Sequence, residues 1–315
     1  MSERAPVFSV IIPTYNRSRL VLRAIRSALA DQSDDYEVIV VDDCSTDDTV
    51  RVLSHLHDAR LRVITCADNG GCCVARNIGA RAARGDWLIF LDSDDELTAD
   101  AMINIRRRAC DAPLDVGKLL FACRFDGGNI SPQPAMTGDV VDYVGYVRWQ
   151  ESTVDGLSEA LPCTRRLAFL QSPYSETRGW LEGLHELNFA QRFRVRLCPE
   201  VVRLYHADAP TRLMVFDDSV PSSKFSGYAG YLEAVLSEHG ETIRRHSPRR
   251  WADLLRGVAI FNFVAGNRTR GIRGSWLGLR ASPANSRTWF VLIAGTLSPW
   301  LLRRIWTARR AQITQ

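Results

Sequence analysis

Near its N-terminus the chain reads VFSVIIPTYNR at residues 7–17, VIVVDDCSTDDT at 38–49 and NGGCCVARNIGARAARGDWLIFLDSDDEL at 69–97. These stretches contain short apolar runs, and the segments between the runs carry apolar residues at helical spacing. The runs lie at residues 7–12, 37–41, 61–66 and 86–91. Strands that alternate with helices predict an α/β fold, in which helices cover both faces of a mainly parallel sheet.

The rest of the chain is less regular up to about residue 220 and then becomes helical. LLFACRF (119–125) predicts a strand, residues 181–193 predict a helix, and VRLCPEVVRLYH (195–206) has extended character. Beyond 220, one apolar stripe that includes Trp251 and Phe261 lies beside several arginines, which is typical of an amphipathic helix.

Polar residues follow three of the predicted strands. Pro13-Thr14-Tyr15-Asn16-Arg17 follows the first, Asp42-Asp43 the second, and Asp92-Ser93-Asp94-Asp95 the fourth. The carboxyl ends of parallel strands meet at one edge of a sheet, where ligands bind at the switch in strand order. We therefore expect these residues to converge on one ligand site.

Asp92 and Asp94 are two positions apart, so in an extended segment their carboxylates point to the same side. Two close carboxylates repel each other unless a cation lies between them. Mg²⁺ or Mn²⁺ accepts such oxygen ligands and completes its shell with water and substrate phosphates. The spacing favours a metal–diphosphate site, and the alternative is that these acidic residues only cap the following helix.

Asn69-Gly70-Gly71 precedes a predicted helix that carries Arg76 in its first turns. The glycines permit a tight turn, and a helix N-terminus attracts phosphate groups. Arg76 is then within reach of a phosphate, although an arginine at such a position is more often only solvated.

Together these stretches resemble family 2 glycosyltransferases, continuously over about residues 7–105 and again near 195–206. The resemblance implies an inverting enzyme with the GT-A (Rossmann-like) fold that uses nucleotide-diphosphate sugars. It implies a GT-A domain over residues 1–215, with a nucleotide-sugar-binding half at 1–110 and an acceptor half at 111–215. Residues 216–315 would be a helical, basic, Trp-rich appendage.

The resemblance also implies roles for single residues. Asp43 would bind the nucleotide base, Arg76 would lie near the diphosphate, and Asp94, together with Asp92, would hold Mn²⁺ or Mg²⁺. The full set of nucleotide-sugar-binding candidates is Pro13, Thr14, Tyr15, Asn16, Arg17, Asp43, Asn69, Arg76, Asp92 and Ser93.

Two positions depart from the family pattern. Cys44 stands where the family has glycine, which is a strained exchange if the backbone there is left-handed. Gly183 replaces the aspartate of an acidic pair that supplies the catalytic base. Inversion needs a carboxylate to take the acceptor's proton, so Glu182 is the first candidate base and Glu186, one turn later, the alternative. His185 is a further candidate.

The net charge of +4 conceals an uneven distribution. Residues 241–315 hold 14 Arg, no Lys, and only Glu241 and Asp253 as acids, which gives this segment +12 and the first 240 residues −8. An acidic body argues against nucleic-acid binding, and the basic tail suggests an anionic partner of its own. Five of the eight tryptophans also lie in the tail.

Residues 289–302 are apolar but too short to span a bilayer, and Pro299 interrupts them. They favour an interfacial helix on the inner face of a bacterial plasma membrane, where lipid-linked glycan acceptors are found. The alternatives are packing against the catalytic domain, a homodimer interface or an acidic protein partner. We expect a cytoplasmic protein with free thiols, because the N-terminus does not resemble a secretory signal and the cysteines show no zinc-ligand spacing.

Two other functional classes share features with this sequence. A non-catalytic GT-A relative would bind nucleotide-sugar or act as a scaffold for a glycan assembly complex, and the altered acidic pair is compatible with it. A phosphotransfer receiver domain expects its acidic cluster at the first strand and a lysine late in the sheet, and the sequence offers neither.

Overall fold

The computed structural model describes residues 6–153, 159–177, 182–206 and 221–305. The chain forms two compact units, which we describe separately. The first contains Met1–Tyr146, Ser152–Arg178 and Asn188–Pro210, and the second contains Val147–Glu151, Gly179–Leu187 and Thr211–Gln315.

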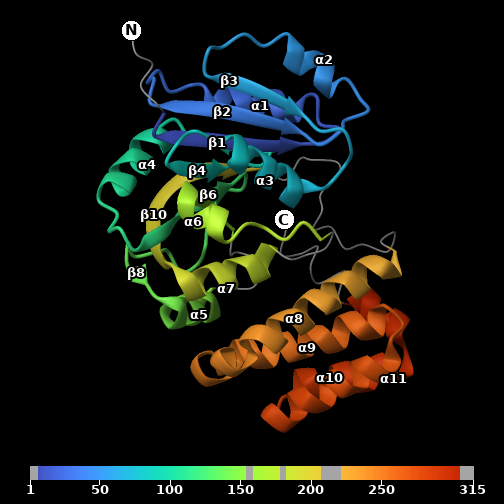
Figure 1. Cartoon of the computed structure of the whole chain (residues 1–315). Helices are drawn as coiled ribbons and strands as arrows, with labels where there is room; N and C mark the ends of the chain where they lie inside the picture. The colour runs from blue at the N-terminus through green and yellow to red at the C-terminus, as the bar shows by residue number, and fades with distance from the viewer. Residues whose placement is uncertain (1–5, 154–158, 178–181, 207–220, 306–315) are drawn as a thin grey trace. The chain divides into compact units, whose positions relative to one another are not determined.

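Strands and helices alternate through the first unit (Figure 1). The strands are β1 (Phe8–Thr14), β2 (Tyr36–Asp42), β3 (Leu61–Thr65), β4 (Trp87–Phe90), β5 (Glu96–Leu97), β6 (Val116–Phe125), β7 (Ile130–Ser131), β8 (Val140–Val141), β9 (Ala160–Arg165) and β10 (Arg194–Tyr205). The helices of the chain up to β10 are α1 (Leu20–Ala28), α2 (Thr49–Ser54), α3 (Cys72–Ala82), α4 (Ala101–Cys110), α5 (Tyr143–Ser152), α6 (Arg166–Gln171) and α7 (Glu182–Arg192).

The strands form one mixed sheet in the order β3-β2-β1-β4-β9-β6-β10-β5. β1 lies parallel to both β2 and β4, and β2 is parallel to β3. β9 enters antiparallel between β4 and β6, and β10 is again parallel to β6. The predicted α/β fold with a mixed, mainly parallel sheet is confirmed. Because the strand order reverses at β1, the ends of β1 and β4 flank the switch point.

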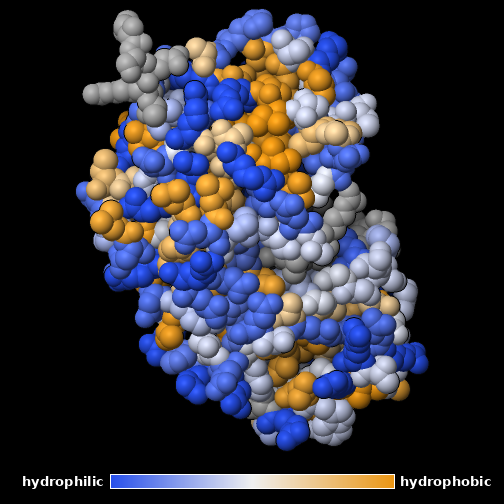
Figure 2. Space-filling view, viewed as in Figure 1, coloured by the Kyte–Doolittle hydropathy of each residue, from blue (hydrophilic) through white to orange (hydrophobic). Residues whose placement is uncertain are grey.

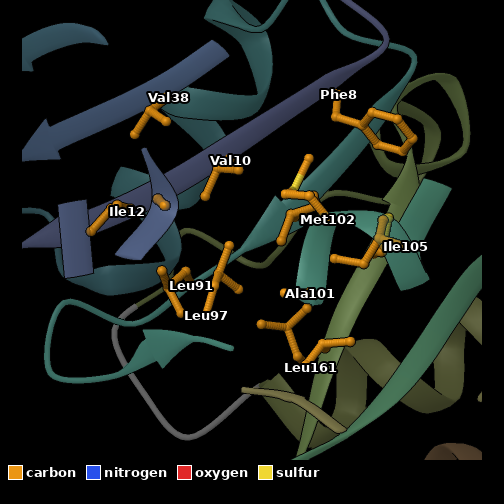
Figure 3. Packing of buried hydrophobic residues seen from close by; sticks show 14 of the residues in the cluster. Phe8, Val10, Ile12, Val38, Leu91, Leu97, Ala101, Met102, Ile105 and Leu161 are labelled. Atoms are coloured by element: carbon orange, nitrogen blue, oxygen red, sulfur yellow. The ribbon is translucent and has the colours of Figure 1, made fainter. Parts of the chain in front are cut away.

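Both faces of the sheet are covered, which explains why the central strands read as continuous apolar runs. Val10 and Ile12 of β1 pack on one face against α1 and α4, and part of this cluster is shown in Figure 3. Ile11, between them in sequence, points to the other face and packs with α3 and Phe169 of α6. This double burial holds the carboxyl ends of β1, β2 and β4 in fixed register.

Residues 222–297 of the second unit form four helices, with α9 packed against α8, α10 and α11 (Figure 1). They are α8 (Ser222–His246), α9 (Pro248–Val264), α10 (Arg268–Ala281) and α11 (Ser286–Leu297). Phe263 of α9 is fully buried, and glycines at 271 and 295 let α10 and α11 approach it. Across the described residues, no helix is both long and apolar enough to cross a membrane.

Candidate functional site

The loops that follow β1 and β2 are tied together at the carboxyl edge of the sheet. Asp43 N donates to Thr14 O at 2.9 Å, and Asn16 Oδ1 accepts from Thr46 N at 2.7 Å. Pro13 and Thr14 are buried, whereas Tyr15 and Asn16 are exposed. The end of β1 is therefore held in place, and it exposes the side chains of Tyr15 and Asn16 next to the acidic end of β2.

Asp43 joins β2 to the glycine turn that precedes α3. Its two carboxylate oxygens accept from Gly70 N at 2.8 Å and from Gly71 N at 2.7 Å, and its carbonyl accepts from Asn69 Nδ2 at 3.1 Å. Gly71 has a φ of +92°, a conformation that side chains rarely adopt. The turn thus requires a glycine, and Asp43 fixes where it lies.

The segment from Asp92 to Asp95 is a turn closed by a hydrogen bond from Asp95 N to Asp92 O at 3.1 Å. The expectation that this segment is extended is therefore wrong, although the two carboxylates remain close enough for the charge of Asp92 to raise the pKa of Asp94. Asp and Ser are strong turn formers, and their local preference outweighs the extension of β4. The two carboxylates instead contact different arginines.

These arginines come from the neighbouring elements. Arg76 of α3 donates from Nη2 to Asp92 Oδ1 at 2.6 Å, while Arg17 Nη1 lies 2.9 Å from Asp94 Oδ1 and 3.2 Å from Ser93 Oγ. Arg76 is buried and also lies over the ring of Tyr174. The structure therefore brings together the predicted donor-site residues from all three strand ends and from α3.

Arg203 of β10 is a component that the sequence analysis missed. It is 3% exposed, and its guanidinium lies 3.6 Å from Asp92 Oδ2, 3.4 Å from Asp95 Oδ2 and 2.9 Å from Glu159 Oε2. Its Nε donates to Cys123 Sγ at 3.0 Å. The stretch 195–206 was identified as extended, but nothing in it marks Arg203 as facing inward.

His206 and Arg23 extend the same network and were also missed. The ring nitrogens of His206 lie 2.6 Å from Asp126 Oδ1 and 2.8 Å from Glu96 Oε1. Arg23 donates to the carbonyl of Asp94 and lies 3.7 Å from Glu96 Oε1. The turn after β4 is thus anchored by side chains from α1 and from the end of β10.

The surroundings of the three aspartates in the turn shift their pKa values in different directions. Burial acts to raise the pKa of Asp92, but Arg76 and Arg203 outweigh it and hold that pKa below its usual value. Burial and the charge of Asp92 raise the pKa of Asp94, against the opposing effect of Arg17. Burial raises the pKa of Asp95 to about 8, although Arg203 opposes it.

Asp92 and Asp94 provide a donor set that fits a hard divalent cation. Both offer carboxylate oxygens, the ligands that Mg²⁺ and Mn²⁺ prefer. Their side chains are 36% and 16% exposed, and an ionised carboxylate has about four lone-pair positions, so the arginine contacts leave room for a further ligand.

Cys44 occupies a left-handed backbone position, with a φ of +64°. This conformation explains why the family pattern has glycine here, since a side chain in it costs roughly 1–2 kcal/mol. Cys44 Sγ donates to Ala67 O at 3.3 Å, a weak interaction that offsets little of that cost.

The candidate bases lie on α7, in the part that belongs to the second unit. Glu182 is exposed at the first position of the helix, and Glu186 is half-buried with Oε1 3.5 Å from His185 Nδ1. A Cβ on Gly183 would lie 2.2 Å from the hydroxyl of Tyr231, so an aspartate does not fit at 183 unless Tyr231 moves. Trp180 and Leu181, which precede Glu182 in the motif, lie outside the described residues.

Comparison with known families identifies residues 9–145 as matching the model "Glycosyl transferase family 2". Among curated proteins, the chain is 40% identical over 107 residues to the succinoglycan biosynthesis protein ExoO of Rhizobium meliloti (strain 1021). That alignment covers 34% of this chain and 31% of ExoO. The chain thus spans about a third of the length of the curated relatives that it matches first.

Two solved structures share the fold over nearly the whole chain. TarS 1–349 of S. aureus in complex with UDP-GlcNAc superposes with a TM-score of 0.61 at 19% identity, covering 97% of this chain and 91% of that 1–349 chain. The mannosyltransferase PcManGT of Pyrobaculum calidifontis in complex with GDP-Man and Mn²⁺ gives 0.55 at 18% identity, covering 98% and 85%. At these identities the likeness establishes the fold.

Arg203→Met tests how strongly the buried guanidinium stabilises the first unit. The substitution leaves Asp92, Asp95 and Glu159 without their shared partner, so the free energy of unfolding should fall by about 3–5 kcal/mol. Urea denaturation measures the loss, with Arg81→Met, which breaks an exposed ion pair, as a control that costs less than about 1 kcal/mol. Adding Asp95→Asn should restore part of the stability. If the free energy of unfolding falls no further for Arg203→Met than for the control, the buried guanidinium does not stabilise the first unit.

Cys44→Gly should leave the free energy of unfolding unchanged or raise it by up to about 1 kcal/mol. Relief of the left-handed strain compensates for the greater freedom of glycine in the unfolded chain. Cys66→Gly, at a nearby position without positive φ, is the matched control and should lose about 0.5–1 kcal/mol. Equal losses from the two variants in thermal denaturation would show that position 44 is not strained.

Proposed function

We propose that the chain is a family 2 glycosyltransferase that transfers a sugar from a nucleotide-diphosphate sugar to an acceptor hydroxyl, because residues 9–145 match the model of that family and the fold is GT-A. The acceptor is a glycan or lipid-linked glycan, and the product belongs to a bacterial cell-surface polysaccharide or glycoconjugate. The observation that carries the proposal is the convergence of Asn16, Asp43, Arg76, Asp92 and Asp94 at one edge of the sheet.

The donor fits this edge by charge and by position. In this proposal Thr14 and Tyr15 would contact the nucleoside. Asp43, whose two carboxylate oxygens already accept from Gly70 N and Gly71 N, would use its remaining lone pairs for the base. Arg76, at the start of α3, is a cation for the diphosphate, and the N-terminus of that helix adds its own positive end. Arg17 bridges the two regions, because it contacts Ser93 and Asp94 while following β1 directly.

Asp94, together with Asp92, would hold Mn²⁺ or Mg²⁺ against the diphosphate. The cation would neutralise negative charge that grows on the leaving nucleotide. Arg76 and Arg17, which contact the same carboxylates, would add positive charge beside the leaving diphosphate, so this edge would favour the transition state over the ground state. TarS and PcManGT, which share the fold, are described with UDP-GlcNAc and with GDP-Man and Mn²⁺ respectively.

Inversion requires a base on the side of the acceptor, opposite the leaving nucleotide. Glu182 is our first choice, because it aligns with the first acid of the family's acidic pair and is exposed at the helix start. Glu186 is the alternative, one helical turn later on the same side. In either case the carboxylate takes the acceptor's proton as the acceptor oxygen attacks the anomeric carbon.

We further propose that the enzyme works in the cytoplasm at the inner face of the plasma membrane, held there peripherally by its basic C-terminal region. Lipid-linked acceptors are presented at that surface, so attachment shortens the search for substrate. Nucleic acid is not a partner in this proposal, whereas homodimerisation is compatible with it.

One observation favours a second candidate function. Tyr231 fills the space that the side chain of an aspartate at 183 would need, so the usual acidic pair is absent. A chain that binds nucleotide-sugar without transferring it, or acts as a scaffold for a glycan assembly complex, is the alternative. Donor binding without hydrolysis or transfer would identify this function.

Asp94→Ala should abolish transfer and leave the fold intact, because it removes the proposed metal ligand from a partly exposed position. A thermal-shift panel of nucleotide-diphosphate sugars, with and without Mn²⁺, measures donor binding, and we expect a metal-dependent shift for one donor. Asp34→Ala, which removes an exposed acid of the same unit, is the matched control and should behave as wild type. Wild-type turnover by Asp94→Ala in excess EDTA would exclude a metal at this residue.

Glu182→Gln and Glu186→Gln form a pair that identifies the base. Loss of the base should lower the transfer rate by roughly 10²–10⁴-fold while donor affinity stays unchanged, since the carboxylate acts on the acceptor. We expect this result for Glu182→Gln and a small effect for Glu186→Gln, measured by product formation with the donor found in the panel. If Glu186→Gln lowers the transfer rate more than Glu182→Gln, Glu186 is the base. If neither substitution lowers the rate, the base does not come from α7.

A further inference from the structure

The last described helices of the second unit expose an unusual number of large apolar side chains. We call the exposed residues Trp276, Trp289, Phe290, Ile293, Leu297 and Trp300 the aromatic face. Leu297 is 79% exposed and Trp300 63%. Figure 2 shows hydrophobic and hydrophilic residues side by side on the surface over α10 and α11. Exposed apolar groups of this size commonly mark a binding surface.

The aromatic face continues from one helix to the next. On α11, Trp289, Phe290, Ile293 and Leu297 recur at intervals of three and four, so they form a single stripe. The rings of Trp276 on α10 and Trp289 on α11 meet edge to face, with centroids 6.4 Å apart. The two helices therefore present one surface rather than two separate patches.

Packing on the opposite side of these helices determines which residues are exposed. Val291 and Gly295 of α11 are buried, and a Cβ at 295 would lie 2.3 Å from the ring of Phe263. Gly271 of α10 meets the same ring, where a Cβ would lie 2.7 Å away. Because only glycine lets the two helices approach Phe263, neither can rotate to bury the stripe without losing that contact.

Arginines surround the aromatic face. Residues 265–305 contain seven arginines and no acidic residue. Arg273 and Arg280 are exposed on α10 one turn before and after Trp276, and the guanidinium of Arg304 lies over the ring of Trp300 at 4.9 Å. The surface therefore combines apolar side chains with the positive charge of arginines.

We propose that the aromatic face lies on the surface of an anionic lipid bilayer, with α11 in the plane of the interface. The proposal names the surface that makes the membrane contact, and it rests on the peripheral attachment proposed above. Tryptophan is enriched at the level of lipid headgroups, where its ring is partly apolar and its N–H remains hydrated. Arginine pairs well with lipid phosphates, and apolar burial combined with basic charge is the usual requirement for stable interfacial binding.

Charge decides against a second copy of the chain as the occupant. A symmetric dimer through this face would bring Arg273 and Arg280 of the two copies together, and the segment 265–305 contributes no acidic residue between them. An anionic bilayer supplies both the apolar layer for the stripe and the negative charge for its border. We therefore assign the face to lipid.

Flotation of the full-length chain with vesicles tests the proposal. We expect binding to phosphatidylcholine vesicles that contain phosphatidylglycerol, and at least about tenfold weaker binding to phosphatidylcholine alone. Phe290→Ser/Ile293→Ser/Leu297→Ser should weaken binding to the anionic vesicles at least about tenfold, since it removes three side chains that would enter the interface. The matched control is Ile103→Ser/Leu114→Ser/Leu167→Ser, which changes three exposed apolar residues of the first unit and should bind as wild type.

A second pair of variants separates the contribution of charge. Arg273→Gln/Arg280→Gln should weaken binding to anionic vesicles severalfold and reduce its salt dependence, whereas Arg26→Gln/Arg124→Gln, exposed arginines of the first unit, should not. All of these substitutions are at exposed positions, and circular dichroism of each variant checks that the helices remain.

Three results would overturn the proposal. One is equal vesicle binding by wild type and the triple-serine variant of α11. Another is a dimer in sedimentation equilibrium that only this variant loses, which would assign the face to a second copy. The third is binding of polyglutamate but not of anionic vesicles, which would assign it to an acidic protein. The donor thermal shift of the same variants reports on the nucleotide site alone, so failure of the membrane proposal and failure of the transfer proposal remain distinguishable.

Discussion

Mutual repulsion among carboxylates at the carboxyl edge of the sheet is the constraint around which the first unit is built. Asp92, Asp94 and Asp95 lie in one turn, and Glu96 and Glu159 lie at its border. Such a cluster is stable only where positive groups are fixed beside it. Four arginines provide them, and each comes from a different part of the chain: Arg17, Arg23, Arg76 and Arg203.

The same arrangement suits the anionic donor that we propose. Arg203 is buried behind the turn and is committed to three carboxylates, so it stabilises the fold whatever is bound. Arg17 contacts Asp94 and Arg76 contacts Asp92, the carboxylates that we propose as metal ligands, and Arg203 shares Asp92 with Arg76. Positive charge is thus divided between a structural group inside and two groups next to the proposed diphosphate. Preorganised charge of this kind needs no rearrangement during the reaction, which is how electrostatic catalysis becomes effective.

Sequence reasoning located this edge because parallel topology makes it predictable. Once apolar runs alternate with helical spacing, the residues after β1, β2 and β4 must share one side of the sheet. The backbone of Asp92–Asp94 was predicted wrongly as extended, because a local turn preference competes with strand extension and spacing alone does not show which prevails. Arg203 was missed for a different reason. Its burial depends on acids more than 40 residues away along the chain, and no local pattern in β10 reveals them.

In both units, the uneven distribution of charge matches the binding partner that we propose for that unit. In the first unit, acidic side chains gather at the edge of the sheet where we propose that a cation and a diphosphate bind. A buried arginine neutralises part of the remaining negative charge. In the second unit the packing of Phe263 against Gly271 and Gly295 forces the apolar stripe of α11 outward, although burying that stripe would be favourable. An exposed stripe that packing cannot remove, in a segment (265–305) that contains seven arginines and no acidic residue, suits a surface that is both apolar and anionic. A bilayer of anionic lipids is both apolar and anionic, whereas a second copy of this positively charged segment is not anionic.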